Sequence, residues 1–226
     1  MRFSRINSYA DYVAALRQVG FSLASHNPEG IFSLSSSFGP KIHWHTGDPD
    51  SDPWQFRVRI MEECPDIAYG SVFLRKHGFI TREWYPRFMA LRRPLSLEQA
   101  YREGRISTEA RTIYAAIAAN AGIPVHELKS LLGSLGRSKG FERALVDLQM
   151  WLYCSMSGNA QKISRRGEAY GWPSACYALP ETLFGPELED EAADIDPEEA
   201  KASISDRILE VNPEASAKDI KRFLRA

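Results

Sequence analysis

The sequence predicts an α+β, helix-dominated protein in which a winged helix-turn-helix carries an N-terminal α/β elaboration and C-terminal helices. Between residues 107 and 180, two short helical patterns, a longer amphipathic one and a polar hairpin-like segment follow in the order of a winged helix. Aromatic-rich helical patterns precede this stretch, and two apolar-striped patterns follow it. The expected divisions are an N-terminal elaboration with aromatic-rich helices (1–95), a winged helix (96–184), an acidic linker (185–199) and a C-terminal helical pair (200–226).

Three helices are predicted in the N-terminal elaboration. The first carries a four-residue apolar stripe and ends at Gly20. The second begins at Pro53 with Asp52 or Ser51 as its cap, because a short polar side chain can accept the first free N–H groups of a helix. The third is capped at Thr81. The inward-facing positions of the second and third helices are expected to be Trp54, Val58, Met61, Trp84, Phe88 and Leu91.

The winged helix is predicted from caps and periodicity. Ser96 and Gln99 have capping-box spacing in a short leading helix. The next helix is capped at Ser107, Pro124 opens a second one, and residues 138–151 form the third. Two strands, 152–156 and 174–179, then enclose a polar loop, 158–172, where a wing would lie.

Cations on the third helix and the wing are the candidate DNA contacts, because phosphate contacts position such a module on a duplex. The third helix is expected to expose Lys139, Arg143, Asp147 and Met150. Glu142 and Asp147 on this side would repel phosphate, so solvated charges on a protein-contact surface are the alternative. The candidate DNA-binding residues are Arg137, Lys139, Arg143, Lys162, Arg165 and Arg166.

Charge divides along the chain, although the net charge is −1. Residues 1–96 hold 12 Lys and Arg against 9 Asp and Glu, and residues 97–180 hold 10 against 7. Residues 181–226 hold 6 against 13. The balances of +3, +3 and −7 permit DNA binding in the middle block, while the acidic end opposes strong nonspecific affinity.

The end of the chain combines this acidity with two amphipathic helices. The segment 185–199 lacks aromatic residues and is expected to be a solvated linker. The helices that follow are too short and too apolar on one side to stand alone. We expect them to dock on the body or on a second copy, and the second arrangement would give a homodimer.

The composition of the sequence indicates in which cellular compartment the protein is expected. No apolar run approaches the length of a membrane span, and the N-terminus lacks the pattern of a secretory signal. The three cysteines, Cys64, Cys154 and Cys176, have no metal-type spacing. We therefore expect a cytoplasmic protein with reduced thiols, no structural disulfide, no membrane partner and no cofactor.

Two constellations have competing interpretations. The aromatic and arginine side chains Trp54, Tyr69, Trp84, Tyr85, Arg92 and Arg93 could line a pocket that stacks a planar ligand, or the aromatics could form core between short helices. His43 and His45 precede Asp48, Asp50 and Asp52, so a metal site can be drawn there. Ordinary turn and cap residues account for the same pattern, and we predict no metal.

Several phrases carry a family resemblance over roughly residues 40 to 180. They are Gly47-Asp48-x-x-x-Asp52-Pro53-Trp54-x-x-Arg57, Ile67-Ala68-Tyr69-Gly70, Gly78-Phe79-Ile80-Thr81-x-Glu83-Trp84-Tyr85-Pro86-x-Phe88 and Arg92-Arg93. This pattern resembles a bacterial family related to the winged-helix DNA glycosylase AlkZ (YcaQ type). The resemblance implies winged-helix repeats and DNA binding. AlkZ-type enzymes use a Gln-x-Gln motif that this sequence lacks, so glycosylase activity is not carried over.

Three functions remain open from the sequence. The first is a winged-helix DNA-binding protein, a regulator or an accessory to repair. The second is an enzyme acting on a nucleobase or nucleoside, for which Glu83 is the nearest general base, although a first-turn acid is also explained by the helix dipole. The third is a dimerisation module.

Overall fold

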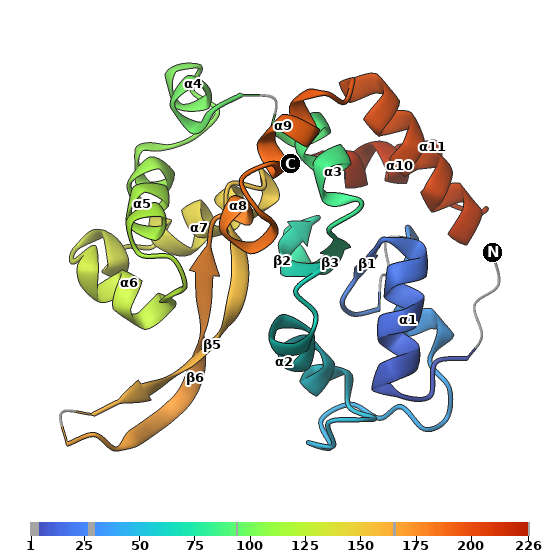
Figure 1. The fold of residues 1–226 in the computed structure, drawn as a ribbon, viewed down its shortest axis with the longest axis horizontal. Helices are drawn as coiled ribbons and strands as arrows, with labels where there is room; N and C mark the ends of the chain where they lie inside the picture. Colours follow the sequence, from blue (N-terminus) through green and yellow to red (C-terminus); the bar gives the residue numbers. More distant parts are fainter. Residues whose placement is uncertain (1–4, 27–29, 94, 165, 226) are drawn as a thin grey trace.

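The computed structural model describes residues 5–26, 30–93, 95–164 and 166–225. Helices make up 50% of the residues and strands 19%, so the predicted helix-dominated α+β class is confirmed. Figure 1 shows a hairpin that projects from a group of helices on one side, with a second lobe beside it. Among the described helices, none combines the length and apolar composition needed to cross a membrane.

One six-stranded sheet runs through the molecule in the order β1-β3-β2-β5-β6-β4, and its neighbouring strands are antiparallel. A single pairing, Tyr69 with Met156, joins its two halves. The strands are β1 (Phe21–Leu23), β2 (Ile67–Phe73), β3 (Lys76–Thr81), β4 (Ile123–Pro124), β5 (Ser155–Ile163) and β6 (Ala169–Ala178).

The first half of the sheet is covered by helices from the N-terminal part of the chain. Ser8 caps α1 (Tyr9–Val19), and Asp52 caps α2 (Pro53–Glu63), whose first residue is the expected proline. Two further elements, the short 3-10 helix η1 (Leu34–Ser37) and α3 (Tyr85–Arg92), complete this lobe. All seven residues of β2 are buried, which places the lobe's core against this strand.

Two details of these helices correct the sequence prediction. The buried face of α2 comprises Phe56 and Ile60, whereas Trp54 is 46% exposed, because the stripe that meets α1 lies two residues further along. The third helix starts at Tyr85 rather than at a Thr81 cap. Thr81 is the last residue of β3 and pairs with Ile67, which keeps it out of the helix.

The middle of the chain contains α4 (Leu97–Arg102), α5 (Thr108–Ala119), α6 (Val125–Leu131), the 3-10 turn η2 (Leu135–Arg137) and α7 (Gly140–Met150). The predicted capping box of Ser96 and Gln99 is present, and Ser107 caps α5 as expected. Strand β4 lies between α5 and α6 in the sequence and pairs with β6. The α5, α6 and α7 helices pack their apolar faces into a separate hydrophobic cluster.

The hairpin is longer than predicted. Much of the segment 158–172, expected to be a polar loop, belongs to β5 and β6, which remain paired as far as Ile163 and Ala169. The sequence signal is weak because the outer strands do not alternate between buried and exposed positions: most of β5 is partly buried, and the first five residues of β6 are exposed. Cys154 and Cys176, at the base of the hairpin, are buried free thiols.

The C-terminal segment folds back on the first lobe. It contains α8 (Pro180–Phe184), α9 (Leu188–Ala193), α10 (Pro197–Val211) and α11 (Ala217–Leu224). The expectation of a solvated linker over 185–199 is wrong for α9, where Leu188 is fully buried and Arg82 pairs with Glu191 at 2.6 Å. Phe223 of α11 stacks on Phe73 at a ring distance of 4.4 Å. The helical pair thus docks on the body of its own chain.

Candidate nucleic-acid interface

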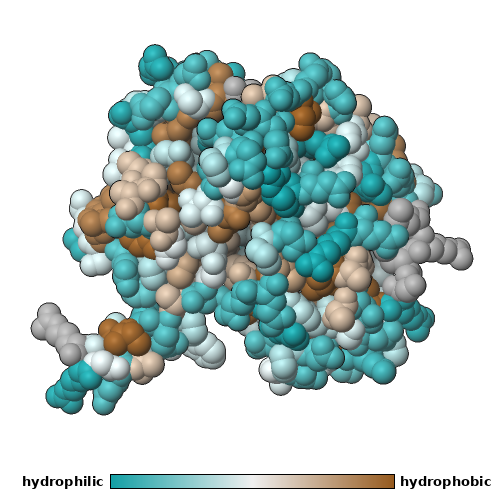
Figure 2. All heavy atoms as spheres, in the orientation of Figure 1, coloured by the Kyte–Doolittle hydropathy of each residue, from teal (hydrophilic) through white to brown (hydrophobic). Residues whose placement is uncertain are grey.

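A groove of about 780 Å³ separates α2 from the hairpin. Figure 2 shows the surface hollowed between the projecting hairpin and the neighbouring lobe. One wall comes from α2 and the loop before it, and the other comes from both hairpin strands. The lining residues are His45, Trp54, Gln55, Arg57, Val58, Glu62, Asn159, Gln161, Trp172 and Pro173.

The loop before α2 is organised by the fully buried carboxylate of Asp52. It accepts hydrogen bonds from the backbone N–H groups of His45 (3.0 Å), Gly47 (2.9 Å) and Trp54 (2.9 Å). Burial by itself raises the pKa of Asp52, but these hydrogen bonds outweigh burial and lower the pKa. One ionised side chain thus holds both the loop and the first turn of the helix.

A stacked pair forms the centre of the α2 wall. The guanidinium carbon of Arg57 lies 3.6 Å from the centre of the Trp54 ring, and its Nε donates to the Trp54 carbonyl at 3.2 Å. This contact holds the indole in one orientation while leaving 46% of the residue exposed. An aromatic ring and a cation therefore line the groove side by side.

The hairpin presents apolar side chains to solvent; Trp172 lines the groove, whereas Ile163 and Tyr170 line a separate hollow beside His126. Trp172 is 88% exposed, Ile163 is 59% exposed and Tyr170 is 54% exposed. Gln161 bridges the two strands through its Nε2, which donates to the carbonyls of Tyr170 and Gly171 at 2.9 Å each. These hydrogen bonds connect the two strands close to Trp172, although the Trp172 side chain itself is almost fully exposed.

The base of the hairpin is fastened to the body. Ser155 Oγ at the start of β5 donates to the carbonyl of Tyr69 at 3.1 Å, and the neighbouring end of α7 is held on β2 by the Ser71 N–H, which donates to Gln149 Oε1 at 2.9 Å. Both side chains are buried. Because buried hydrogen bonds of this kind fix relative position, the hairpin wall of the groove is anchored at its root.

Two polar atoms on β5 are buried without a hydrogen-bond partner among the described residues. They are Ser157 Oγ and Asn159 Nδ2. Asn159 lines the groove. An amide donor left unpaired in this way costs free energy, and a ligand acceptor in the groove would remove that cost.

Only part of the predicted DNA-contact face of the third helix, α7, is exposed. Arg143 is exposed (83% of its side chain), and Arg137 on η2 and Lys139 at the start of α7 are also exposed. The second half of α7 packs on β2, which corrects the expectation that Met150 faces solvent. Met150 is buried and Asp147 binds Arg75 at 2.5 Å, because the turn between β2 and β3 covers this part of the helix.

The predicted wing cations lie on the outer hairpin. Lys162 is half-buried on β5, and Arg166 is exposed in the turn. Arg165 lies outside the described residues. Lys162 lies beside His126, whose Nδ1 is 2.5 Å from Ser174 Oγ. These positions place the described wing cations beyond the groove, toward the end of the hairpin.

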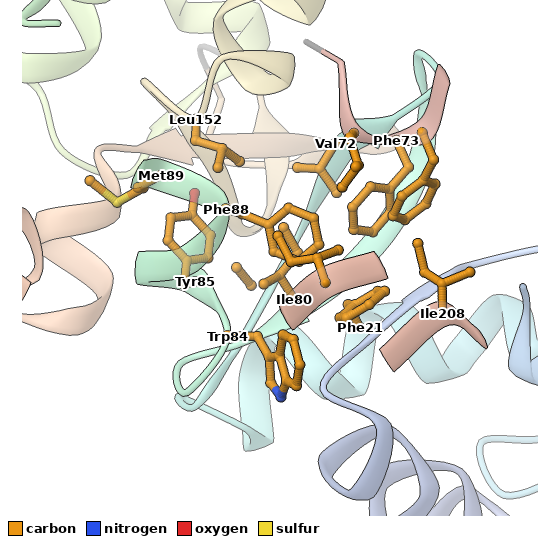
Figure 3. Packing of buried hydrophobic residues seen from close by; sticks show 14 of the residues in the cluster. Phe21, Val72, Phe73, Ile80, Trp84, Tyr85, Phe88, Met89, Leu152 and Ile208 are labelled. Carbon is orange, nitrogen blue, oxygen red and sulfur yellow. The ribbon is translucent and has the colours of Figure 1, made fainter. Parts of the chain in front are cut away.

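The six residues of the predicted aromatic pocket are not brought together. Trp54 lines the groove and Tyr69 is buried on the strand beneath it, whereas Trp84 and Tyr85 pack in a different core cluster. Figure 3 shows Trp84 and Tyr85 among Phe21, Phe88 and other buried side chains. The core interpretation therefore describes Trp84 and Tyr85.

The two arginines of that predicted pocket, Arg92 and Arg93, contact carbonyl and carboxylate groups of the protein itself. Arg92 is 2% exposed and donates to the carbonyls of Val72, Phe223 and Leu224. Arg93 pairs with Glu181 and with Glu189 (2.5 Å). Both guanidinium groups connect the C-terminal segment to the body, so neither reaches the groove.

The histidines at 43 and 45 do not gather with other metal-ligating side chains. Within the described ranges, no group of three His, Cys, Asp or Glu residues is placed to hold a metal ion. The His45 ring instead lies 5.7 Å from that of Trp54. Glu83, the general base suggested by sequence, is exposed just before α3 and does not line the groove.

Sequence reasoning missed the hairpin side of the groove. Trp172, Gln161 and Asn159 lie in the segment expected to be a loop, and nothing in their spacing indicated a strand facing α2. The available signal was Trp172 itself, because tryptophan is uncommon in a polar solvated loop.

Comparison with known proteins places the chain in a family. Neither a curated protein nor a solved structure matches it. A family model described as AlkZ related matches residues 6–225, which is nearly the whole chain and extends the resemblance found over residues 40 to 180. The protein belongs to the AlkZ-related family.

Proposed function

We propose that this protein binds DNA, with residues 96–184 acting as a winged helix and the groove beside its hairpin receiving a strand. The order α5, β4, α6, α7, β5, β6 supports the winged-helix assignment, as does the pairing of β6 with both β4 and β5. Family membership supports DNA as the ligand.

One observation carries the proposal: Trp172 is 88% exposed and lines the same groove as the half-exposed, arginine-stacked Trp54. Exposed aromatic faces stack on unpaired bases regardless of sequence, at about 1 to 3 kcal/mol per base. Arg57 in the groove and Arg166 in the hairpin turn supply positive charge for the backbone. Indole faces and cations together suit a nucleic-acid strand better than a duplex edge.

The hairpin is the better contact surface, and α7 is the poorer one. The exposed side of α7 mixes Arg143 with Glu142, which is itself paired with Lys129. The body covers the second half of this helix, so it cannot lie along a major groove for its full length. We therefore assign the main contacts to the hairpin and α2, and secondary phosphate contacts to Lys139 and Arg143.

The test is a fluorescence-anisotropy titration of labelled single-stranded and duplex DNA at about 50 and 200 mM salt. Wild type is compared with Trp172→Ala, with Lys162→Ala/Arg166→Ala and with Lys139→Ala/Arg143→Ala. Leu131→Ala is the matched control, because Leu131 is 60% exposed on α6 and does not line the groove.

We expect salt-sensitive binding by wild type and the control. Trp172→Ala should weaken binding about tenfold at both salt concentrations, because it removes stacking rather than charge. The hairpin double variant should reduce the salt dependence and should weaken binding more than the α7 double variant. Wild type that fails to bind either DNA, or variants that all bind equally, would refute the proposal.

An enzyme acting on a nucleobase is the second candidate, because Glu62, Gln55 and Gln161 line the groove together. A carboxylate and amides beside stacking aromatics are the groups needed to orient a water near a glycosidic bond. Its test is release of free base from alkylated DNA, compared between wild type and Glu62→Gln. Release lost in the variant while DNA affinity is kept would support it, and no release by wild type would exclude it for that substrate.

A further inference from the structure

A second cavity lies on the other side of the molecule from the hairpin, between α3, the end of α7, α10 and α11. Its volume is about 800 Å³, within the range typical of small-molecule sites. We name it the C-terminal pocket. None of its lining residues belongs to the groove described above.

The interior of the C-terminal pocket is apolar. Ile220 and Leu224 of α11 are each 8% exposed, and Leu209 of α10 is 41% exposed. Leu91 and Trp151 complete the apolar surface from α3 and from the residue after α7. Burying this surface against a hydrocarbon or ring would stabilise a complex through the hydrophobic effect.

The charged lining residues of the C-terminal pocket all have one sign. They are Arg92, Arg105, Lys201, Lys221 and Arg225, and no Asp or Glu among the described residues lines the cavity. This is notable because residues 181–226 hold 13 acidic residues against 6 basic ones. A cavity lined only by cations creates a positive potential that favours an anion.

The rim cations are available to a ligand. Lys221 and Arg225 form no ion pair within the described part of the chain, and both are exposed. In the described ranges, the ion pairs of Arg105 and Lys201 are with exposed neighbours, Glu103 at 3.0 Å and Glu198 at 2.6 Å. Such exposed pairs contribute little stability and exchange readily for another anion.

Arg92 adds a buried charge that has no counterion among the residues that the structure describes. Its partners are three backbone carbonyls and the faces of Phe73 and Phe88, 5.4 and 5.2 Å from the guanidinium carbon. Burial lowers its pKa to about 9, so the group still carries its charge at neutral pH. Removing a charge from water without an opposite charge is costly, and an anion in the adjoining cavity would offset that cost.

We propose that the C-terminal pocket binds a small organic acid with an apolar body, its chain or ring packed on Trp151, Leu209 and Leu224 and its carboxylate among Arg92, Lys221 and Arg225. Apolar walls without cations would favour neutral hydrocarbons, and cations without apolar walls would favour inorganic anions. The C-terminal pocket has both. This inference is independent of DNA binding at the groove.

The test uses decanoate as the probe, with 1-decanol as its uncharged counterpart, in competition with the fluorescent sulfonate ANS. We expect saturable ANS binding at one site. Decanoate should displace ANS at a concentration at least about tenfold lower than 1-decanol does, because only decanoate carries a charge for the cations to bind.

Variants locate the site on the folded full chain. Lys221→Gln/Arg225→Gln should weaken decanoate about tenfold and leave 1-decanol unchanged, since both residues are exposed and the apolar walls stay intact. Lys218→Gln is the control, because it removes a cation from the same helix outside the C-terminal pocket. Absence of saturable binding, equal affinity for the two probes, or an equal effect of Lys218→Gln would overturn the proposal.

Discussion

The two halves of the single sheet differ in what covers them. Every residue of β2 is buried, whereas the first five residues of β6 are exposed, although both strands belong to one hydrogen-bonded sheet. Aromatic residues occur in both halves. In β2 they complete a core. In β6, Tyr170 and Trp172 face solvent, which is unfavourable because their apolar surface remains in contact with water. These exposed aromatics on an anchored hairpin are the observation behind the proposed binding role.

The largest expected effect lies in the covered half. Phe73 packs against Phe21, Phe88 and Phe223 at ring distances of 6.2, 5.4 and 4.4 Å. We expect Phe73→Ala to lower the free energy of unfolding by about 3 to 5 kcal/mol, through lost burial and the cavity left behind. Urea denaturation followed by circular dichroism measures this change. A loss below about 1 kcal/mol would contradict the tightly packed core.

An intermediate effect is expected at Asp52, between the core and the groove. Asp52→Ala removes the acceptor of three backbone N–H groups and should cost about 2 to 3 kcal/mol at pH 6. Amide hydrogen exchange should accelerate at His45, Gly47 and Trp54 while the β2 amides keep their protection. Uniform acceleration would show that the loop is not a separate unit.

The same carboxylate gives a pH dependence with a defined sign. Its pKa is lowered in the folded protein from an ordinary value of 3.8, so its stabilising contribution is complete above about pH 4 to 5 and is lost as the pH falls through the lowered value. The stability difference between wild type and Asp52→Ala should therefore shrink between pH 6 and pH 3. A difference that stays constant over this range would contradict the ionised network.

The smallest stability effect is expected in the exposed outer part of the hairpin. Trp172→Ala should change the free energy of unfolding by less than about 0.5 kcal/mol, because the side chain is 88% exposed. The comparison with Phe73→Ala is made by the same urea denaturation. A destabilisation above about 1.5 kcal/mol would mean that Trp172 packs on the body in solution, and the contrast between the two sheet halves would fail.

Local signals in the sequence predicted much of the helical structure. The caps at Ser107 and Asp52, the proline at the start of α2 and the capping box of α4 were all recognisable, because each depends on a few neighbouring residues. The docking of α10 and α11 followed from their apolar stripes. These features depend on local chemistry that a single sequence contains.

The groove could not be predicted in the same way. Its two walls are separated by about a hundred residues along the chain, and only the tertiary fold brings Trp172 to Trp54. The roles of Arg92 and Arg93 were hidden for the same reason, because their partners lie on α8, α9 and α11. Arg92 and Arg93 lie near the aromatic residues in the sequence, but in the folded protein they are packed away from Trp54 and the groove.

The hydrogen bonds of Arg92 have a consequence for protein synthesis. This side chain lies on α3, and two of the carbonyls it binds belong to Phe223 and Leu224, more than a hundred residues later. During translation, α3 leaves the ribosome long before those carbonyls exist, so the nascent chain carries an incomplete core with Phe73 uncovered. Chains truncated upstream of Phe223 should therefore recruit chaperones. Once α11 has emerged from the ribosome, it can pack on Phe73 and complete the core of the first lobe.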